Sequence, residues 1–517
     1  MYKLEPLIKR WPAVTKPEGH VHFRTKLLWS FVALLAYFVL SNVFIYGLAD
    51  ESLDVFSSFR AILAGQSGSL VHLGIGPIVT GSIIMQLFVG AKIIKLDLTN
   101  SEDKSIYQGA QKILVVVMIF VESIPQVFGF LKPSELALDR FGTGGARTLI
   151  IAQLAIGSYL VFLMDEVVSK WGLGSGISLF IVAGVAQSLF TGFISWLPVQ
   201  EGSALAIDNP PGGVLPRTFY LLSEYTTGQL VGGGGFEHIL IGRPGDTNTI
   251  AALLATVATF FIVVYAESSR IELPLAHGRV RGARGRYPIR LLYASNIPVI
   301  LAGALLANVN LIALLLWSGP LKHMPLLGSC LNEFCTEQRL WVGGYAPGTT
   351  TPVTGIAYYF SQVTGLNQWL LPFLSPQYSG LLLTRESWQI ILHLVVYAAF
   401  MIGGSIIFAI FWIETTNMGP EQVAKQIENS GMQIPGFRRD PRVTAKILER
   451  YIPVVTVIGG AAVGALAVFA DLIGTLGNAT GTGILLAVGI LQRLYEQIAK
   501  EQAMEMHPVL RGFFGEG

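Results

Sequence analysis

Long apolar runs recur along the whole sequence and decide what kind of protein it can form. A transmembrane helix needs about 17–25 mostly apolar residues, and a single segment in lipid satisfies its backbone hydrogen bonds only as a helix. The sequence therefore predicts an all-α membrane protein with ten transmembrane helices. The ten runs are 27–47, 75–94, 109–130, 146–168, 174–197, 248–267, 291–317, 387–413, 452–472 and 479–498.

The overall composition supports this class. Hydrophobic residues make up 52% of the 517 residues, charged residues make up 13%, and the mean hydropathy is +0.56. Soluble domains contain about 25% charged residues. Residues 1–26 are charged and contain three prolines, so we expect no cleavable signal peptide there. The first span is then the segment that enters the membrane.

Positive charge is distributed unequally between the two sides. Of the 35 lysines and arginines, 26 lie in segments on the N-terminal side of the runs and 9 lie on the opposite side. Cytoplasmic loops carry the excess of Lys and Arg in membrane proteins. Because ten spans return the chain to its starting side, we expect a multi-pass protein of the cell membrane with both termini in the cytoplasm.

The runs divide the chain into segments. We predict a cytoplasmic segment 1–26, an N-terminal half 27–198 with spans 1–5, an extracytoplasmic insertion 199–247, a C-terminal half 248–498 with spans 6–10, and a cytoplasmic tail 499–517. The C-terminal half includes cytoplasmic loops 268–290 and 413–450 and an extracytoplasmic insertion 318–386. The insertions are rich in Gly and Pro and show no sustained periodicity. Cys330 and Cys335, the only cysteines, lie in the second insertion, where a disulfide is possible.

The stretch from Asp54 to Ile94 departs from the pattern of an ordinary span. Its first part carries Arg60 and several small polar residues, and it is too short and too polar to cross a bilayer. Its second part is apolar but begins with Gly74, Gly76 and Pro77, which leave backbone groups that protein or water must satisfy. We expect a half-helix that dips into the membrane, followed by a full span, and together they line a cavity.

A second interruption lies five spans later. The seventh span is broken at S-N-I-P-V-I, Ser295 to Ile300, as the second is broken at G-I-G-P-I-V. Paired Gly/Pro interruptions in corresponding spans are typical of inverted repeats with a working site between them. The sequence thus predicts two pseudo-symmetric five-helix halves.

No enzymatic motif accompanies these features. The sequence has neither a phosphate-binding loop nor an H-E-x-x-H zinc motif, and its eight histidines are not at ligand spacing. We expect no cofactor and no metal. Glu122 is an acid within the third span, where an ionisable side chain is a functional candidate or forms a structural hydrogen bond with a neighbouring helix. Thr80, Gln86 and Asn296 are polar residues on the interrupted spans, and they can bridge spans at about 1 kcal/mol each.

Arginines concentrate in the two cytoplasmic loops of the C-terminal half. The first loop contains H-G-R-V-R-G-A-R-G-R-Y-P, and the second contains a polar helical run followed by I-P-G-F-R-R-D-P-R. Topology alone explains any single arginine. Six arginines within 270–290 exceed what topology requires, and a dense cationic tip suits a polyanion such as ribosomal RNA.

Six longer motifs are distributed along the chain. They are L-G-I-G-P-I-V-T-G-S-I-I-M-Q-L (73–87), G-L-G-S-G-I-S-L-F-I-V-A-G-V (172–185), Y-A-S-N-I-P-V-I (293–300), T-N-M-G-P-E-Q-V-A-K-Q-I (416–427), I-P-G-F-R (434–438) and G-T-G-I-L-L (481–486). Together they resemble the SecY family, the alpha subunit of the Sec protein-translocation channel, and most closely its archaeal branch. The resemblance covers all ten spans in order.

This resemblance implies a protein-conducting channel with a pore closed at its waist. A ring of aliphatic side chains forms the constriction, a short re-entrant plug helix at about 55–66 closes it from outside, and a lateral gate opens between spans 2–3 and 7–8. The positions that match are Ile75, Val79, Ile181, Val185, Ile300 and Leu486 for the pore ring, Phe56, Phe59, Arg60, Ile62 and Leu63 for the plug, and Thr80, Glu122 and Asn296 for the gate. By periodicity alone the ring residues are ordinary core or lipid-facing positions.

The resemblance also implies partners. The family pairs this subunit with the small SecE (gamma) and beta subunits, docks a ribosome on the cytoplasmic loops, and handles signal sequences, nascent polypeptides and membrane lipid. The ribosome-binding positions that match are Arg279, Arg281, Arg284 and Arg438.

Two other functions are compatible with the pattern. A secondary transporter of a small solute shares the broken spans and the inverted repeat, but it needs a polar or charged binding site at mid-membrane. A membrane scaffold or insertase without a pore is the other alternative. The aliphatic ring positions favour a conduit.

Charge reversal of the loop arginines tests their assignment. Replacing Arg279, Arg281 and Arg284 by Glu should weaken ribosome binding in a salt-dependent way, with the largest loss at low salt, because each lost phosphate contact also removes a counterion-release contribution. Co-sedimentation of ribosomes with reconstituted protein measures this. Unchanged binding would restrict these arginines to a topological role.

Overall fold

The computed structural model describes most of the ten predicted runs and parts of the loops between them. The described residues are 14–19, 21–49, 63–90, 93–94, 96, 100–199, 204–232, 234–242, 248–277, 284–290, 296–318, 343–345, 351–374, 386–416, 418–429, 432–433, 441–477 and 479–506.

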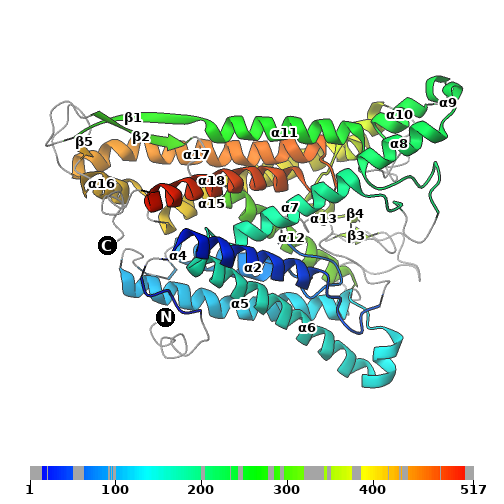
Figure 1. Ribbon diagram of the computed structural model, residues 1–517, viewed down its shortest axis with the longest axis horizontal. Helices are drawn as coiled ribbons and strands as arrows, with labels where there is room; N and C mark the ends of the chain where they lie inside the picture. Colours follow the sequence, from blue (N-terminus) through cyan, green and yellow to red (C-terminus); the bar gives the residue numbers. More distant parts are fainter. Residues whose placement is uncertain are drawn as a thin grey trace.

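One long helix corresponds to each predicted run. In Figure 1 these helices lie side by side, with strands β1 and β2 beyond one end of α11 and the short helices α8–α10 beyond the other. The long helices are α2 (Phe23–Ser41), α4 (Gly76–Gly90), α5 (Ser101–Gly129), α6 (Glu135–Trp171), α7 (Gly176–Ile194), α11 (Ile250–Ser268), α12 (Ile297–Ser318), α15 (Ser387–Thr415), α17 (Pro441–Ile473) and α18 (Gly481–Met506).

Eight of the helices in the described part of the chain are long and apolar enough to cross a membrane. The other two long helices differ for separate reasons. Helix α4 is apolar but has only 15 residues. Helix α18 begins with the apolar run Gly481–Leu491 and continues into the charged sequence Q-R-L-Y-E-Q-I-A-K-E. The count of ten crossing segments therefore stays a prediction.

The two halves repeat the same helix contacts. In the first half α4 packs on α5, α5 on α6, and α2 on α6 and α7. In the second half α12 packs on α15, α15 on α17, and α11 on α17 and α18, so each pair has its counterpart five spans later. The halves meet where α4 contacts α12 and α15, where α5 contacts α12, and where α7 and α2 contact α18. This arrangement agrees with the predicted pair of pseudo-symmetric five-helix halves.

The predicted interruptions become the first turns of helices. Helix α4 begins at Gly76 and Pro77, and Pro298 is the second residue of α12. Proline costs little there, because the first N–H groups of a helix have no partner within it. Gly74, with φ +56°, turns the chain into α4, and a Cβ there would overlap the carbonyl oxygen of Leu63.

Parts of the loops predicted to be cytoplasmic, 268–290 and 413–450, form a small sheet, which the all-α prediction did not include. Strand β1 (Arg270–His277) pairs antiparallel with β2 (Arg284–Arg290), from Arg270 opposite Arg290 to Ala276 opposite Arg284, and also with β5 (Met432–Gln433). The Gly- and Arg-rich sequence indicated only a turn; the pairing of β1 with β2 is a local hairpin, and the added pairing with β5 joins it to a strand far along the chain. Helix α16 (Pro420–Asn429) is the predicted polar helical run.

Both insertions that were predicted to be extracytoplasmic, 199–247 and 318–386, contain structure that their composition did not indicate. The first folds into α8 (Val214–Glu224), α9 (Thr227–Gly232) and α10 (Gly235–Leu240). The second contains β3 (Gly344–Tyr345), β4 (Pro352–Thr354), α13 (Ile356–Tyr359), the 3₁₀ helix η4 (Leu366–Gln368) and α14 (Leu371–Leu374). These elements are too short for a periodicity to be recognised in sequence. Cys330 and Cys335 lie outside the described residues.

A close contact between α6 and the loop before α4 yields a stability prediction. A Cβ at Gly157 would overlap the backbone carbonyl of Leu70, whereas a Cβ at Gly403 in α15 would meet nothing within 4 Å. Gly157→Ala should therefore destabilise the protein by about 1–3 kcal/mol, the usual cost of overpacking. Thermal unfolding in detergent should show a lower midpoint for Gly157→Ala and an unchanged one for Gly403→Ala. Equal midpoints would contradict this packing.

Candidate functional site

The six predicted ring residues lie in one buried hydrophobic cluster. Ile75 directly precedes α4, Val79 belongs to α4, Ile181 and Val185 to α7, Ile300 to α12 and Leu486 to α18. None of the six is more than 8% exposed. Four helices, two from each half, thus contribute branched aliphatic side chains to this cluster. The ring arrangement within this cluster stays a prediction.

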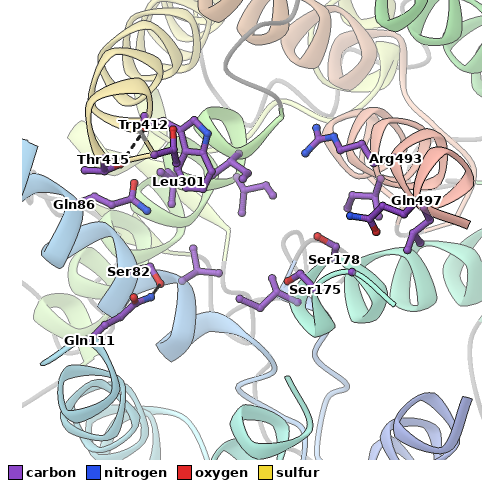
Figure 2. A pocket seen from close by; sticks show the side chains of 18 of the residues that line it. Ser82, Gln86, Gln111, Ser175, Ser178, Leu301, Trp412, Thr415, Arg493 and Gln497 are labelled. Atoms are coloured by element: carbon purple, nitrogen blue, oxygen red, sulfur yellow. Dashed lines mark hydrogen bonds between the residues drawn. The ribbon is translucent and has the colours of Figure 1, made fainter. Parts of the chain in front are cut away.

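A cavity of about 600 Å³ opens on one side of this cluster. Val79 and Ile300 are part of its lining, so its floor is aliphatic. Polar side chains lie on two opposite walls: Figure 2 shows Ser82, Gln86 and Gln111 on one wall and Ser175, Ser178, Arg493 and Gln497 across from them. Apolar side chains, among them Ile177 and Leu494, line the rest. A cavity of this size with several polar groups holds water, so water reaches the aliphatic cluster from this side.

Polar contacts join three helices beside the cluster. Thr80 Oγ1 on α4 donates to Glu122 Oε1 on α5 at 2.9 Å, and Asn308 Nδ2 on α12 donates to Thr80 Oγ1 at 3.2 Å. Glu122 is buried. Nearer the N-terminal end of α5, Gln111 Nε2 donates to Ser82 Oγ of α4 at 2.6 Å. The Thr80–Glu122–Asn308 cluster therefore spans the junction between the two halves.

Asn296 does not belong to this cluster. It precedes α12 and lies buried against α18, where its Nδ2 contacts the carbonyl oxygen of Leu485 at 3.4 Å. Asn308 lies about 18 Å farther along the chain, at ~1.5 Å per helical residue. The structure thus brings Thr80 and Glu122 together and places Asn308, not Asn296, beside Thr80; the gate assignment itself stays a prediction.

Of the five predicted plug residues, only Leu63 is described; Phe56, Phe59, Arg60 and Ile62 lie outside the described residues. Leu63 is buried in the central cluster, and its carbonyl oxygen accepts from the N–H of Ile75 at 2.8 Å. Tyr37 Oη of α2 donates to the carbonyl of Ala64 at 3.0 Å. The segment that leaves the plug is therefore bonded directly to a predicted ring residue.

The four predicted ribosome-binding arginines are mostly outside the described part. Arg279, Arg281 and Arg438 are not described, and Arg284 is placed only as the first residue of β2, opposite Ala276. Their assignment stays a prediction.

Sequence reasoning missed three polar residues near this site. Asn308 is a polar residue within an apolar span, which by itself marks a functional candidate. His72 joins the loop before α4 to α5, since its Nε2 lies 3.2 Å from Gln126 Oε1 and its Nδ1 accepts from the N–H of Gly68 at 3.1 Å. Asp471 is a buried acid in α17, and the same intramembrane rule applied to V-F-A-D-L-I would have selected it.

Comparison with known sequences decides the family. The sequence profile named SecY matches residues 69–495. The chain belongs to the SecY family. A second profile, the plug domain of Sec61p, matches residues 35–68, which include the predicted plug.

SecY proteins of archaea resemble the chain over its full length. The protein translocase subunit SecY of Archaeoglobus fulgidus is 46% identical over 516 residues, covering 99% of this chain and 98% of the relative. The same subunit from Halobacterium salinarum is 45% identical over 519 residues, with 99% and 98% coverage. The predicted resemblance to the archaeal branch of the SecY family is confirmed.

Solved structures agree with the fold. One described as a protein conducting channel is 37% identical, has a TM-score of 0.74 and covers 98% of each chain. Sec61 in the canine ribosome-channel complex from the endoplasmic reticulum is 36% identical, has a TM-score of 0.71 and covers 98% of each chain. The SecY fold therefore holds for the whole chain.

Proposed function

We propose that this chain is the pore-forming subunit of a protein-conducting channel, which passes unfolded polypeptides across the membrane and releases transmembrane helices sideways into lipid. One observation supports this most directly: a polar cavity ends on a buried cluster of aliphatic side chains from both halves. A transporter would place a charged or polar binding group at that point. The acid at this depth, Glu122, is bonded to Thr80 and does not line the cavity.

The aliphatic cluster gives the channel its seal. Narrow apolar constrictions exclude water and so block ions. Branched aliphatic side chains also shift rotamers at low cost, so they can follow the contour of a passing chain. We therefore assign the pore ring to Ile75, Val79, Ile181, Val185, Ile300 and Leu486. The plug, which joins Ile75 through Leu63, closes the ring from outside.

The cluster Thr80, Glu122 and Asn308 is the proposed lateral gate. Hydrogen bonds between helices in membranes contribute about 0.6 kcal/mol on average. Two such bonds can be offset by the insertion of one apolar segment. A signal sequence can therefore open the gate without any other source of energy at that step.

Orientation and partners follow from charge and from the ends of the bundle. Lys26 Nζ at the start of α2 and Glu501 Oε1 near the end of α18 form an ion pair at 2.6 Å, so the first and last long helices begin and end on the same side. With 26 of 35 basic residues on that side, we place both termini in the cytoplasm. There the arginine loops would dock a ribosome. SecE (gamma) and beta subunits would complete the complex.

Deleting residues 56–65 tests the function. If the plug seals a pore, the reconstituted variant should conduct ions through a wide pathway in planar bilayers while the full-length chain conducts little. Coupled uptake of a small solute would instead identify a transporter. No conductance in either protein would identify a scaffold without a pore.

Paired asparagine variants test the gate. Asn308→Ala removes a bond between α12 and α4, so the closed-to-open balance should shift about threefold, the equivalent of ~0.6 kcal/mol. Export of a substrate with a weakened signal sequence should rise accordingly in membrane vesicles. Asn296→Ala, the matched control, should leave export unchanged. The gate assignment is wrong if Asn308→Ala behaves like the control.

A further inference from the structure

The described part of the second insertion lies across the outer ends of three helices. We call residues 356–371 the outer brace; it comprises α13, η4 and the start of α14. On α12, Asn310 Nδ2 donates to the carbonyl oxygen of Phe360 at 3.3 Å. Asn310 is two residues beyond the gate residue Asn308, so the brace is bonded to the gate wall itself.

The brace also packs on α15. His393 Nε2 lies 2.9 Å from the carbonyl oxygen and 3.2 Å from the hydroxyl of Ser361. The ring of Tyr358 lies 4.3 Å from the His393 ring, and Phe360 meets Phe400 edge-on at 5.5 Å. These contacts combine hydrogen bonds with aromatic packing, so α15 cannot slide under the brace without losing both.

Hydrogen bonds to two backbone carbonyl oxygens fix the brace to α17. The N–H of Gly365 donates to the carbonyl oxygen of Asp471 at 2.8 Å, and Trp369 Nε1 donates to the carbonyl oxygen of Leu472 at 2.9 Å. Both carbonyls belong to the last turn of α17, where they have no partner within the helix. The brace therefore satisfies the outer end of α17.

Asp471 extends this connection to two further helices. Its Oδ2 accepts from Tyr397 Oη of α15 at 2.7 Å and from Thr482 Oγ1 of α18 at 2.7 Å, and its Oδ1 accepts from the N–H of Thr482 at 3.0 Å. Asp471 is 1% exposed. Thr482 lies one helical turn before the ring residue Leu486, so the carboxyl group holds the start of the helix that carries part of the ring.

We propose that Asp471 and the outer brace fasten α12, α15, α17 and α18 into one rigid body, and that the gate opens by movement of α4 and α5 away from it. Asp471 is then a positioning residue for the gate wall and for Leu486. The inference rests on the proposed channel function. According to this proposal, the second insertion holds α12 in place, so that α4 and α5 are the helices that move when the gate opens.

The strengths of the contacts support this choice. Removing one partner from a buried, multiply bonded carboxyl group costs more than removing a neutral pair. The bond between α12 and α4 is a neutral one, from Asn308 to the half-buried Thr80. When an apolar segment enters the gate, the bond between Asn308 and Thr80 should therefore break before the bonds of Asp471 do.

Distances between spin labels test the movement. Labels are placed at exposed positions, Ile124 on α5, Ile312 on α12 and Phe469 on α17, in full-length chain whose Cys330 and Cys335 are replaced by Ser. The complex is reconstituted in liposomes and measured with and without a synthetic signal peptide. The peptide should lengthen the 124–312 distance and leave the 312–469 distance unchanged. A lengthened 312–469 distance in the unsubstituted brace would overturn the proposal.

Variants of Asp471, of its partner Thr482 and of the brace residue Trp369 test the role of Asp471. Asp471→Ala and the milder Thr482→Val and Trp369→Phe should broaden the 312–469 distance distribution and raise the ion conductance without substrate, by about tenfold for Asp471→Ala. Thr456→Val is the matched control, because the buried Thr456 hydroxyl bonds only the carbonyl of Ile452 in its own helix, at 2.6 Å.

Different results would contradict the proposed role of the brace and the proposed channel function. If Asp471→Ala does not fold, the two milder variants give the result. An unchanged 312–469 distribution in folded variants overturns the brace while signal-peptide-dependent opening of the 124–312 distance upholds the channel. If the peptide alters neither distance and the plug deletion does not conduct, the proposed function itself is wrong.

Discussion

Every backbone polar group at membrane depth must find a partner inside the protein, and this constraint organises the whole structure. It restricts the spans to helices and makes each interruption conspicuous. At the second span the interruption is satisfied by the chain itself: Ile75 donates to Leu63 and Tyr37 reaches the carbonyl of Ala64. The break is therefore a fixed junction between Leu63 of the predicted plug and Ile75 at the start of α4, a residue of the proposed pore ring.

The same constraint explains how polar side chains are used. At the proposed gate, the bond that crosses between the halves is a neutral one, from Asn308 to Thr80, and it is weak because alternative partners exist when the helices separate. At the C-terminal end of α17, the carboxyl group of Asp471 accepts from Tyr397 and twice from Thr482, and a buried carboxyl group that loses such bonds has no cheap alternative. Polar residues thus occur both where we propose that helices separate and where we propose that they are held together.

The sequence alone predicted the helices well, because apolar length is a local property, and each of the ten runs became one long helix. It predicted Thr80 and Glu122 through their motifs. It did not bring out Asn308, which helix register places beside Thr80 where the prediction had named Asn296. The hairpin of β1 and β2 is local, but its Gly- and Arg-rich sequence indicated only a turn. The pairing of β1 with β5 joins residues more than a hundred positions apart, and the brace lies in a segment without periodicity.

Strong fastening within each half and weaker fastening between the halves give the fold a direction of movement. The helix contacts of the halves match pair by pair. Asp471 and the brace join the helices of the C-terminal half, His72 joins the loop before α4 to α5, and a neutral bond from Asn308 to Thr80 connects α12 to α4. Helix α4 also carries Val79 toward the pore and Thr80 toward the gate on adjacent residues, about 100° apart around the helix. A displacement of α4 therefore widens the constriction and breaks the gate contact in the same motion. Opening toward the other side of the membrane and opening toward lipid are then two consequences of one movement.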